Sequence, residues 1–205
     1  DGKFIELQKN DYTAPVEYII KKKERFAEPW FYRTMSRDPS DDGCQSQPYC
    51  MNQPPEPLRA LKSAIDKKSS ATNKGFFRDN SKLVVVIISD ADEREVGSED
   101  PKATRPKDAL KYVGEKLPKM DGVIGLSVII KPGDSACLAR HQNIFDMGAG
   151  GRYGEMLSEF AKLTGGQTAS VCDGDLGPAL SKLSEAVRQQ VESIVLKEVP
   201  MPGSL

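Results

Sequence analysis

The chain has 205 residues, of which 38% are hydrophobic and 29% are charged, a balance typical of one globular domain with a sizeable core. Its formal net charge is −1, so no global field favours binding to nucleic acid or to an anionic membrane surface. No apolar run reaches the roughly 18 residues that a transmembrane helix needs. A single histidine, His141, excludes histidine-rich metal sites.

The first quarter of the chain is extended and polar in character. Residues 3–7 alternate apolar and polar side chains, and residues 16–20 are rich in β-branched and aromatic side chains, so both segments are predicted as strands. Residues 36–55 form a proline-rich polar loop, of a kind that is often functional or tied by a disulfide.

A helix and a strand follow this loop. Leu58, Leu61 and Ile65 share one helical face and predict a helix over about 55–67. The β-branched run 83–88 predicts a strand that is buried on both faces, as in a parallel sheet covered by helices.

The same alternation continues toward the C-terminus. Thr104 and Pro106 open a helix that ends at Pro118, and residues 123–130 are predicted as a second buried strand. A third helix, a short strand over 168–172 and a last helix follow. The third helix has a predicted buried face of Tyr153, Met156, Leu157 and Phe160, and the last has Leu180, Leu183, Val187, Val191 and Ile194 after a capping Asp175.

This order of elements defines the predicted fold class. Helix and strand alternate from residue 55 onward, which indicates right-handed crossover units. We therefore expect an α/β fold with a doubly wound, mostly parallel sheet and helices on both faces. Residues 197–205 are predicted as a linker toward a further domain.

The four cysteines are Cys44, Cys50, Cys137 and Cys172, which make one local and one distant pair. No C-x-x-C spacing is present, which argues against a zinc knuckle or a thioredoxin-type motif. An even number of cysteines fits two disulfides and an oxidising compartment. Four reduced thiols in a cytosolic protein are the alternative.

An acidic turn follows the first buried strand and is the main candidate site. Asp90, Asp92 and Glu93 stand where the strand 83–88 ends, and ligand sites of open parallel sheets lie at such carboxyl ends. Clustered carboxylates there suit Mg²⁺ or Ca²⁺, which take oxygen ligands. A cluster that caps a helix or solubilises a loop is the alternative.

Other motifs for chemistry are weak. The glycines at 148–151 precede a helix but do not follow a strand directly, so they fail the context of a dinucleotide fingerprint and are read as loop residues. His141 is read as an exposed histidine in a polar loop. We expect no enzyme activity.

Several segments resemble von Willebrand factor A-like domains of secreted or surface bacterial proteins. The central strand and acidic turn of that family resemble residues 76–78 and 83–93, and its penultimate helix and last strand resemble residues 153–172. Cys137 and Cys172 are similar in position to a cysteine pair of those bacterial members. The resemblance covers about residues 1–196.

The resemblance implies a metal-ion-dependent adhesion site built from three loops. Asp90 matches the aspartate of the third loop, and we place Asp92 and Asn52 beside it as further ligands. In the second loop, residues 52–54 stand where the family has a threonine. The D-x-S-x-S motif of the first loop is absent from this chain.

The first strand of the family, which lies in the middle of its sheet, is also missing. Its absence would leave long unpaired strand edges, which are a liability. We therefore expect the first strand and the D-x-S-x-S loop to lie upstream of Asp1, or another chain to donate the strand.

The function implied by the resemblance is protein–protein binding or adhesion outside the cytoplasm, in the periplasm, on the outer membrane surface or as a secreted protein. Mg²⁺ or Ca²⁺ would assist binding through the partial site. A metal-free structural subunit of a surface or envelope assembly is one alternative, in which the loop of Cys44 and Cys50 makes the contact. A Mg²⁺-dependent enzyme of phosphoryl-transfer type is the other. We expect a protein partner, no nucleic acid and no membrane-spanning segment.

Overall fold

The computed structural model describes residues 55–70, 73–94, 97–142, 151–175 and 177–192. The chain divides into two compact units, which are described separately. The first unit comprises residues 1–81 and 92–120, and the second comprises residues 82–91 and 121–205. The predicted strands 3–7 and 16–20 and the linker 197–205 lie outside the described residues.

A parallel sheet forms the centre of the second unit. Its described strands are β1 (Leu83–Ile88), β2 (Val123–Ile129) and β3 (Gln167–Ser170), in the order β1-β2-β3. All pairs are parallel. The predicted α/β class is therefore confirmed, and the three predicted strand segments all lie in this sheet.

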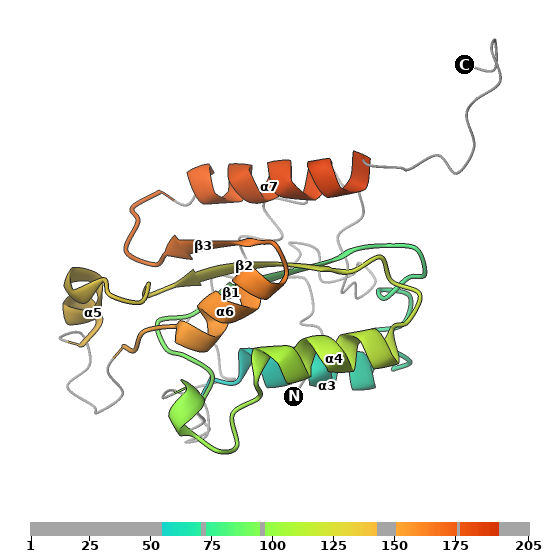
Figure 1. The fold of residues 1–205 in the computed structure, drawn as a ribbon, viewed down its shortest axis with the longest axis horizontal. Helices are drawn as coiled ribbons and strands as arrows, with labels where there is room; N and C mark the ends of the chain where they lie inside the picture. Colours follow the sequence, from blue (N-terminus) through green and yellow to red (C-terminus); the bar gives the residue numbers. More distant parts are fainter. Residues whose placement is uncertain (1–54, 71–72, 95–96, 143–150, 176, 193–205) are drawn as a thin grey trace, which may run out of the picture. The chain divides into compact units, whose positions relative to one another are not determined.

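Helix α6 (Glu155–Leu163) covers one face of the sheet (Figure 1). The hydroxyl of Ser127 on β2 donates to the carbonyl of Leu157 at 2.8 Å. A Cβ atom at Gly125 of β2 would lie only 2.8 Å from the ring of Phe160 and 2.9 Å from Oγ1 of Thr164. Glycine is therefore required at position 125 for the helix to approach the strand this closely.

Helix α7 (Gly177–Glu192) covers the opposite face (Figure 1). Its Ala179 and Val187 pack against a buried cluster of β2 and β3 side chains that comprises Ile124, Leu126, Val128 and Ala169. The predicted cap is confirmed, because the N–H of Gly177 donates to Oδ1 of Asp175 at 2.7 Å. The predicted buried face is confirmed at Val187 and wrong at Leu180, which is 49% exposed, because Ala179 packs against the sheet in place of Leu180.

Strand β1 is not buried on both faces, contrary to the prediction from its composition. Val84, Val86 and Ile88 are 38%, 46% and 57% exposed. They align with Ile124, Leu126 and Val128 of β2, so they lie on the sheet face that α7 covers. Helix α7 contacts β3, whereas β1 is at the opposite edge of the described sheet. These side chains of β1 are therefore left exposed.

A helix that the sequence did not predict follows β2. This helix, α5 (Ser135–Gln142), begins after Asp134, whose Oδ1 accepts the N–H of Cys137 at 3.0 Å. Its buried side chain is Cys137, so it lacks the repeated apolar residues that signal a helix in a sequence.

In the part of the first unit that the structure describes, the helices α3 (Pro57–Asp66) and α4 (Pro106–Lys116) pack side by side, and the short 3₁₀ helix η1 (Gly97–Glu99) lies between them in sequence. Both α-helices confirm the predicted segments, and Pro57 and Pro106 stand in their first turns. Their buried side chains include Leu58, Ile65, Ala109 and Val113. Among the helices that the structure describes, none is both long enough and apolar enough to cross a bilayer.

Candidate functional site

The candidate site lies at the carboxyl edge of the sheet in the second unit. Because the strands are parallel, the segments that leave β1, β2 and β3 meet at this edge. They lead to Asp90, to helix α5 and to Cys172 respectively. Figure 1 shows α5 beyond the arrowheads of β2 and β3.

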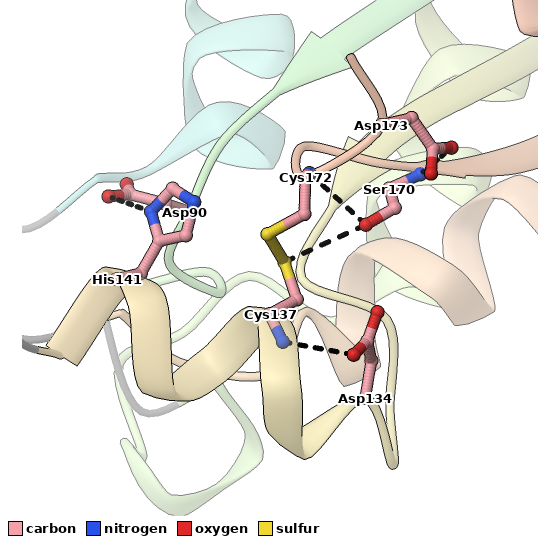
Figure 2. The surroundings of a disulfide bond; sticks show 7 residues. All are labelled: Asp90, Asp134, Cys137, His141, Ser170, Cys172 and Asp173. Atoms are coloured by element: carbon pink, nitrogen blue, oxygen red, sulfur yellow. Dashed lines mark hydrogen bonds and ion pairs between the residues drawn. A yellow bond between two sulfur atoms is a disulfide. The ribbon is translucent and has the colours of Figure 1, made fainter.

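A disulfide joins two of these segments. Cys137 on α5 is bonded to Cys172 after β3, with 5.7 Å between the two Cα atoms, across 35 residues of chain (Figure 2). The predicted distant pair is therefore present in the structure. Cys137 is 2% exposed, whereas Cys172 is half-buried. The predicted local pair, Cys44 and Cys50, lies outside the described residues.

Polar contacts of Ser170 surround the disulfide. Its hydroxyl oxygen accepts the N–H of Cys172 at 3.2 Å and lies 3.6 Å from the sulfur of Cys137. Its own N–H donates to Oδ2 of Asp173 at 3.3 Å. These contacts fix the backbone that presents Cys172 at the end of β3 (Figure 2).

The side chains of Asp90 and His141 form a hydrogen bond beside the disulfide. The distance from Nδ1 of His141 to Oδ2 of Asp90 is 3.3 Å, and their side chains are 22% and 45% exposed respectively. The interpretation of His141 as an exposed loop residue is therefore wrong, since it lies in α5 and contacts Asp90. His141 stands four residues after Cys137 and so shares its helix face, but this spacing indicates a shared face only once the helix is known.

The segment before α6 packs against Asp90 and His141. The N–H of Arg152 donates to the carbonyl of Asp90 at 2.8 Å. A Cβ atom at Gly151 would lie 2.6 Å from Cβ of His141 and 3.2 Å from the carbonyl oxygen of Asp90. Glycine at 151 therefore allows the chain to pass against the two hydrogen-bonded residues.

The other two carboxylates of the acidic turn belong to the first unit and are buried there. Glu93 is 0% exposed and accepts the backbone N–H groups of Leu58 at 2.9 Å and Arg59 at 3.2 Å. These are donors of the first turn of α3, so Glu93 acts as the helix cap. Asp92 is 2% exposed and its carboxylate lies against Gly97.

Burial shifts the titration of Glu93. Desolvation raises the pKa of this carboxyl above its usual value of 4.5, and the hydrogen bonds from Leu58 and Arg59 oppose the shift. Nearby, the guanidinium of Arg94 lies 2.8 Å from Asp100 and also pairs with Glu56. The hydrogen bond from Arg94 lowers the pKa of Asp100.

The structure places the three predicted ligands of Mg²⁺ or Ca²⁺ in different situations. Asp90 has an accessible carboxylate at the carboxyl edge, Asp92 is buried in the first unit, and Asn52 lies outside the described residues. Within the described ranges, the group of His, Cys, Asp or Glu side chains that could hold a metal ion is instead Cys137, His141 and Cys172.

The first unit has a separate hollow of about 400 Å³ near the end of α4. Its lining includes four cationic side chains, Lys68, Arg78, Lys116 and Lys119. Three of these cations already have partners. Lys68 donates to the carbonyl of Lys116, and Lys119 pairs with Asp79 at 3.0 Å. The ammonium of Lys116 lies 5.6 Å from the centroid of the Tyr112 ring. We therefore take the carboxyl edge of the second unit as the candidate site.

No protein-family model matches the chain, and comparisons with curated proteins and with solved structures found no match either. The resemblance to von Willebrand factor A-like domains therefore stays a prediction from the sequence.

Proposed function

We propose that the chain is a protein-binding module that acts outside the cytoplasm and contacts its partner through the carboxyl edge of the sheet. We call this surface the rim and define it by Asp90, Cys137, His141, Arg152 and Cys172. The observation that carries the proposal is the cross-linking of the rim. A disulfide, a hydrogen bond between side chains and a backbone hydrogen bond together tie the segments that leave all three strands.

Cross-linked loops suit a binding surface. Loops on a rigid sheet often carry function, and loops that are already ordered lose little conformational entropy when a partner binds. The rim also presents both signs of charge, since Arg140 and Arg152 are exposed and the carboxylate of Asp90 is 45% exposed. Mixed charges of this kind favour recognition of a complementary protein surface over an extended polyanion.

Two further features support the placement outside the cytoplasm and the type of partner. A disulfide persists in oxidising compartments, as the bond between Cys137 and Cys172 would. The sequence resemblance implies adhesion or assembly in the periplasm, on the cell surface or after secretion. A metal-free structural subunit of an envelope assembly is the alternative. Its contact would be made by the loop of Cys44 and Cys50, which lies outside the described residues.

Photo-crosslinking from the rim tests the proposal. A photoreactive amino acid at Arg152, in the protein expressed in its native cells, should give a discrete covalent adduct with one protein. The matched control is the same amino acid at Lys162, which is also exposed but stands near the end of α6, close to the amino edge of the sheet. Adducts of equal yield at both positions, or none at Arg152, would contradict the proposal.

Cation dependence is a second candidate property, and the exposed carboxylate of Asp90 at the end of β1 favours it. Mg²⁺ or Ca²⁺ at this position would take Asp90 as one oxygen ligand. Calorimetric titration of the full chain with each ion tests this. Asp90→Ala should abolish the binding heat, whereas Asp121→Ala, an exposed carboxylate just before β2, should not. Equal heats in the two variants would remove Asp90 from any cation site.

A further inference from the structure

We infer that reduction of the disulfide converts the rim into a Zn²⁺ site formed by Cys137, Cys172 and His141, with Asp90 orienting the histidine. The inference does not rest on the proposed binding function. It rests on the close grouping of the two disulfide sulfurs and one imidazole at the carboxyl edge of the sheet (Figure 2).

The three ligand atoms are already grouped. One ring nitrogen of His141 and the sulfurs of Cys137 and Cys172 all lie within 4.8 Å of one another. Around tetrahedral zinc, with bonds of about 2.3 Å to sulfur and about 2.0–2.1 Å to nitrogen, such atoms stand about 3.5–3.8 Å apart. Side-chain rotation alone can therefore bring the atoms to zinc once the two sulfurs have separated.

Helix α5 supplies two of the ligands in a suitable arrangement. Cys137 and His141 are four residues apart and so share one face of the helix. Cys137 stands in the first turn, where the helix dipole favours the negative charge of a thiolate. Cys172 comes from a different element, the segment after β3, so the metal would replace the covalent link between the same two segments.

Asp90 gives the histidine the tautomer that metal binding needs. A carboxylate only accepts hydrogen bonds, so Nδ1 of His141 carries the proton in the 3.3 Å contact with Oδ2 of Asp90. This leaves the lone pair of Nε2 for a metal, and Figure 2 shows that nitrogen on the side of the disulfide. Metal-binding histidines commonly use their second nitrogen in this way.

The conversion needs a dithiol reductant. A thiolate of the reductant attacks the sulfur of Cys172, which is the less buried of the two, and Cys137 leaves as a thiolate. The second thiol of the reductant then displaces Cys172 and the reductant departs as its own disulfide. Zn²⁺ displaces the remaining thiol protons to solvent. Three protein ligands leave a fourth tetrahedral position open.

Metal titration of the full chain tests the inference. The chain is reduced with a water-soluble phosphine, which becomes the phosphine oxide with oxygen from water, and the phosphine is removed without air. Zn²⁺ is then titrated in competition with a chromophoric chelator. Co²⁺ serves as a second probe, because thiolate charge-transfer bands and tetrahedral d–d bands report its ligands. We expect one ion per reduced chain, and none at this site in the oxidised chain.

Matched variants assign the ligands. Cys137→Ser/Cys172→Ser should abolish uptake, whereas Cys44→Ser/Cys50→Ser should retain it. His141→Ala should weaken binding at least tenfold, and its neighbour Gln142→Ala, in the same helix, should leave it unchanged. Asp90→Asn should weaken binding about 10- to 100-fold, the usual effect of losing such an orienting partner.

Four results would overturn the inference. They are no uptake by the reduced chain, equal uptake by the oxidised chain, uptake that follows Cys44 and Cys50, and equal affinity in His141→Ala and Gln142→Ala. The cobalt spectrum provides an independent check, since His141→Ala should change the d–d bands while the thiolate bands persist.

Discussion

At the scale of single residues, the two ends of the acidic turn have different roles. Asp90 is half-exposed and contacts His141, whereas Glu93 is buried and caps α3. The sequence left metal binding and helix capping open for the turn, and the structure confirms capping for Glu93. Both side chains are carboxylates, so the position of α3, which is distant in sequence, distinguishes their roles.

The cap makes Glu93 important for stability. Glu93→Ala leaves the N–H groups of Leu58 and Arg59 without their side-chain acceptor inside the protein. We expect the free energy of unfolding to fall by about 1–3 kcal/mol, the usual cost of such unsatisfied donors. Denaturant unfolding measures it. The exposed Glu159 of α6 is the control, where Ala should change stability by less than about 0.5 kcal/mol. Equal effects would argue against the cap.

The pH dependence of Glu93 has a defined sign. Its pKa is raised in the folded chain, so the folded state holds the proton more tightly than the unfolded chain, where the carboxyl titrates near 4.5. The contribution of Glu93 to stability is therefore full below pH 4.5 and is lost as pH rises through the folded-state pKa.

Glu93→Gln, which cannot titrate, isolates this effect. The unfolding free energy of the native chain minus that of the variant should be greatest at acid pH and should decrease toward neutral pH. Denaturant unfolding of both proteins from about pH 4 to pH 7 measures this difference. A difference that increases with pH would show that the pKa of Glu93 is lowered instead.

At the scale of elements, the approach of α6 to the sheet depends on Gly125. A Cβ atom at this position would meet Phe160 and Thr164 at less than 3 Å, so Gly125→Ala should destabilise the chain by about 1–3 kcal/mol, as overpacking does. Gly114 in α4 is the matched control. It has open space around it, and Ala there should stabilise the helix by about 0.5–1 kcal/mol. Thermal unfolding of both variants measures the two changes in stability, which should have opposite signs. No change of stability in Gly125→Ala would contradict the close approach of α6 to β2.

Sequence patterns predicted some of these helices and strands and missed others. Helices α3 and α4 and strand β2 have strong periodicity or continuous apolar runs, and their existence was predicted correctly. Helix α5 was missed because one buried residue, Cys137, gives no periodic pattern. The exposed face of β1 was missed because composition reports how apolar a strand is, not which neighbours cover it.

The candidate site was predicted in the same partial way. The alternation of helices and strands placed the candidate site at the carboxyl end of β1. The even number of cysteines, with one local and one distant pair, indicated that Cys137 pairs with Cys172. The contact between Asp90 and His141 spans 51 residues and depends on α5, so no local pattern could predict it. Asp92 was grouped with Asp90 by proximity in sequence, and its burial in the first unit could not be seen there.

At the scale of the whole molecule, the disulfide closes a long loop of the second unit. Cys137→Ser/Cys172→Ser removes a cross-link between residues 35 apart, and we expect the free energy of unfolding to fall by about 2–4 kcal/mol. Denaturant unfolding measures the loss, and peptide mapping without reductant checks that the native chain carries the link. A linked native chain whose variant loses less than about 0.5 kcal/mol would show that the bond does not support the fold.

The most direct test of the account is the yield of the rim adduct in two charge variants. With the photoreactive amino acid at Arg152, the Asp90→Ala chain should give much less adduct than the native chain, because the variant loses the hydrogen bond with His141 and a charge of the rim. Asp121→Ala, at the amino edge of the sheet, should give the native yield, and both variants should keep the native melting temperature within a few degrees. An undiminished adduct in Asp90→Ala, or an equal loss in Asp121→Ala, would show that the carboxyl edge of the sheet is not the binding surface.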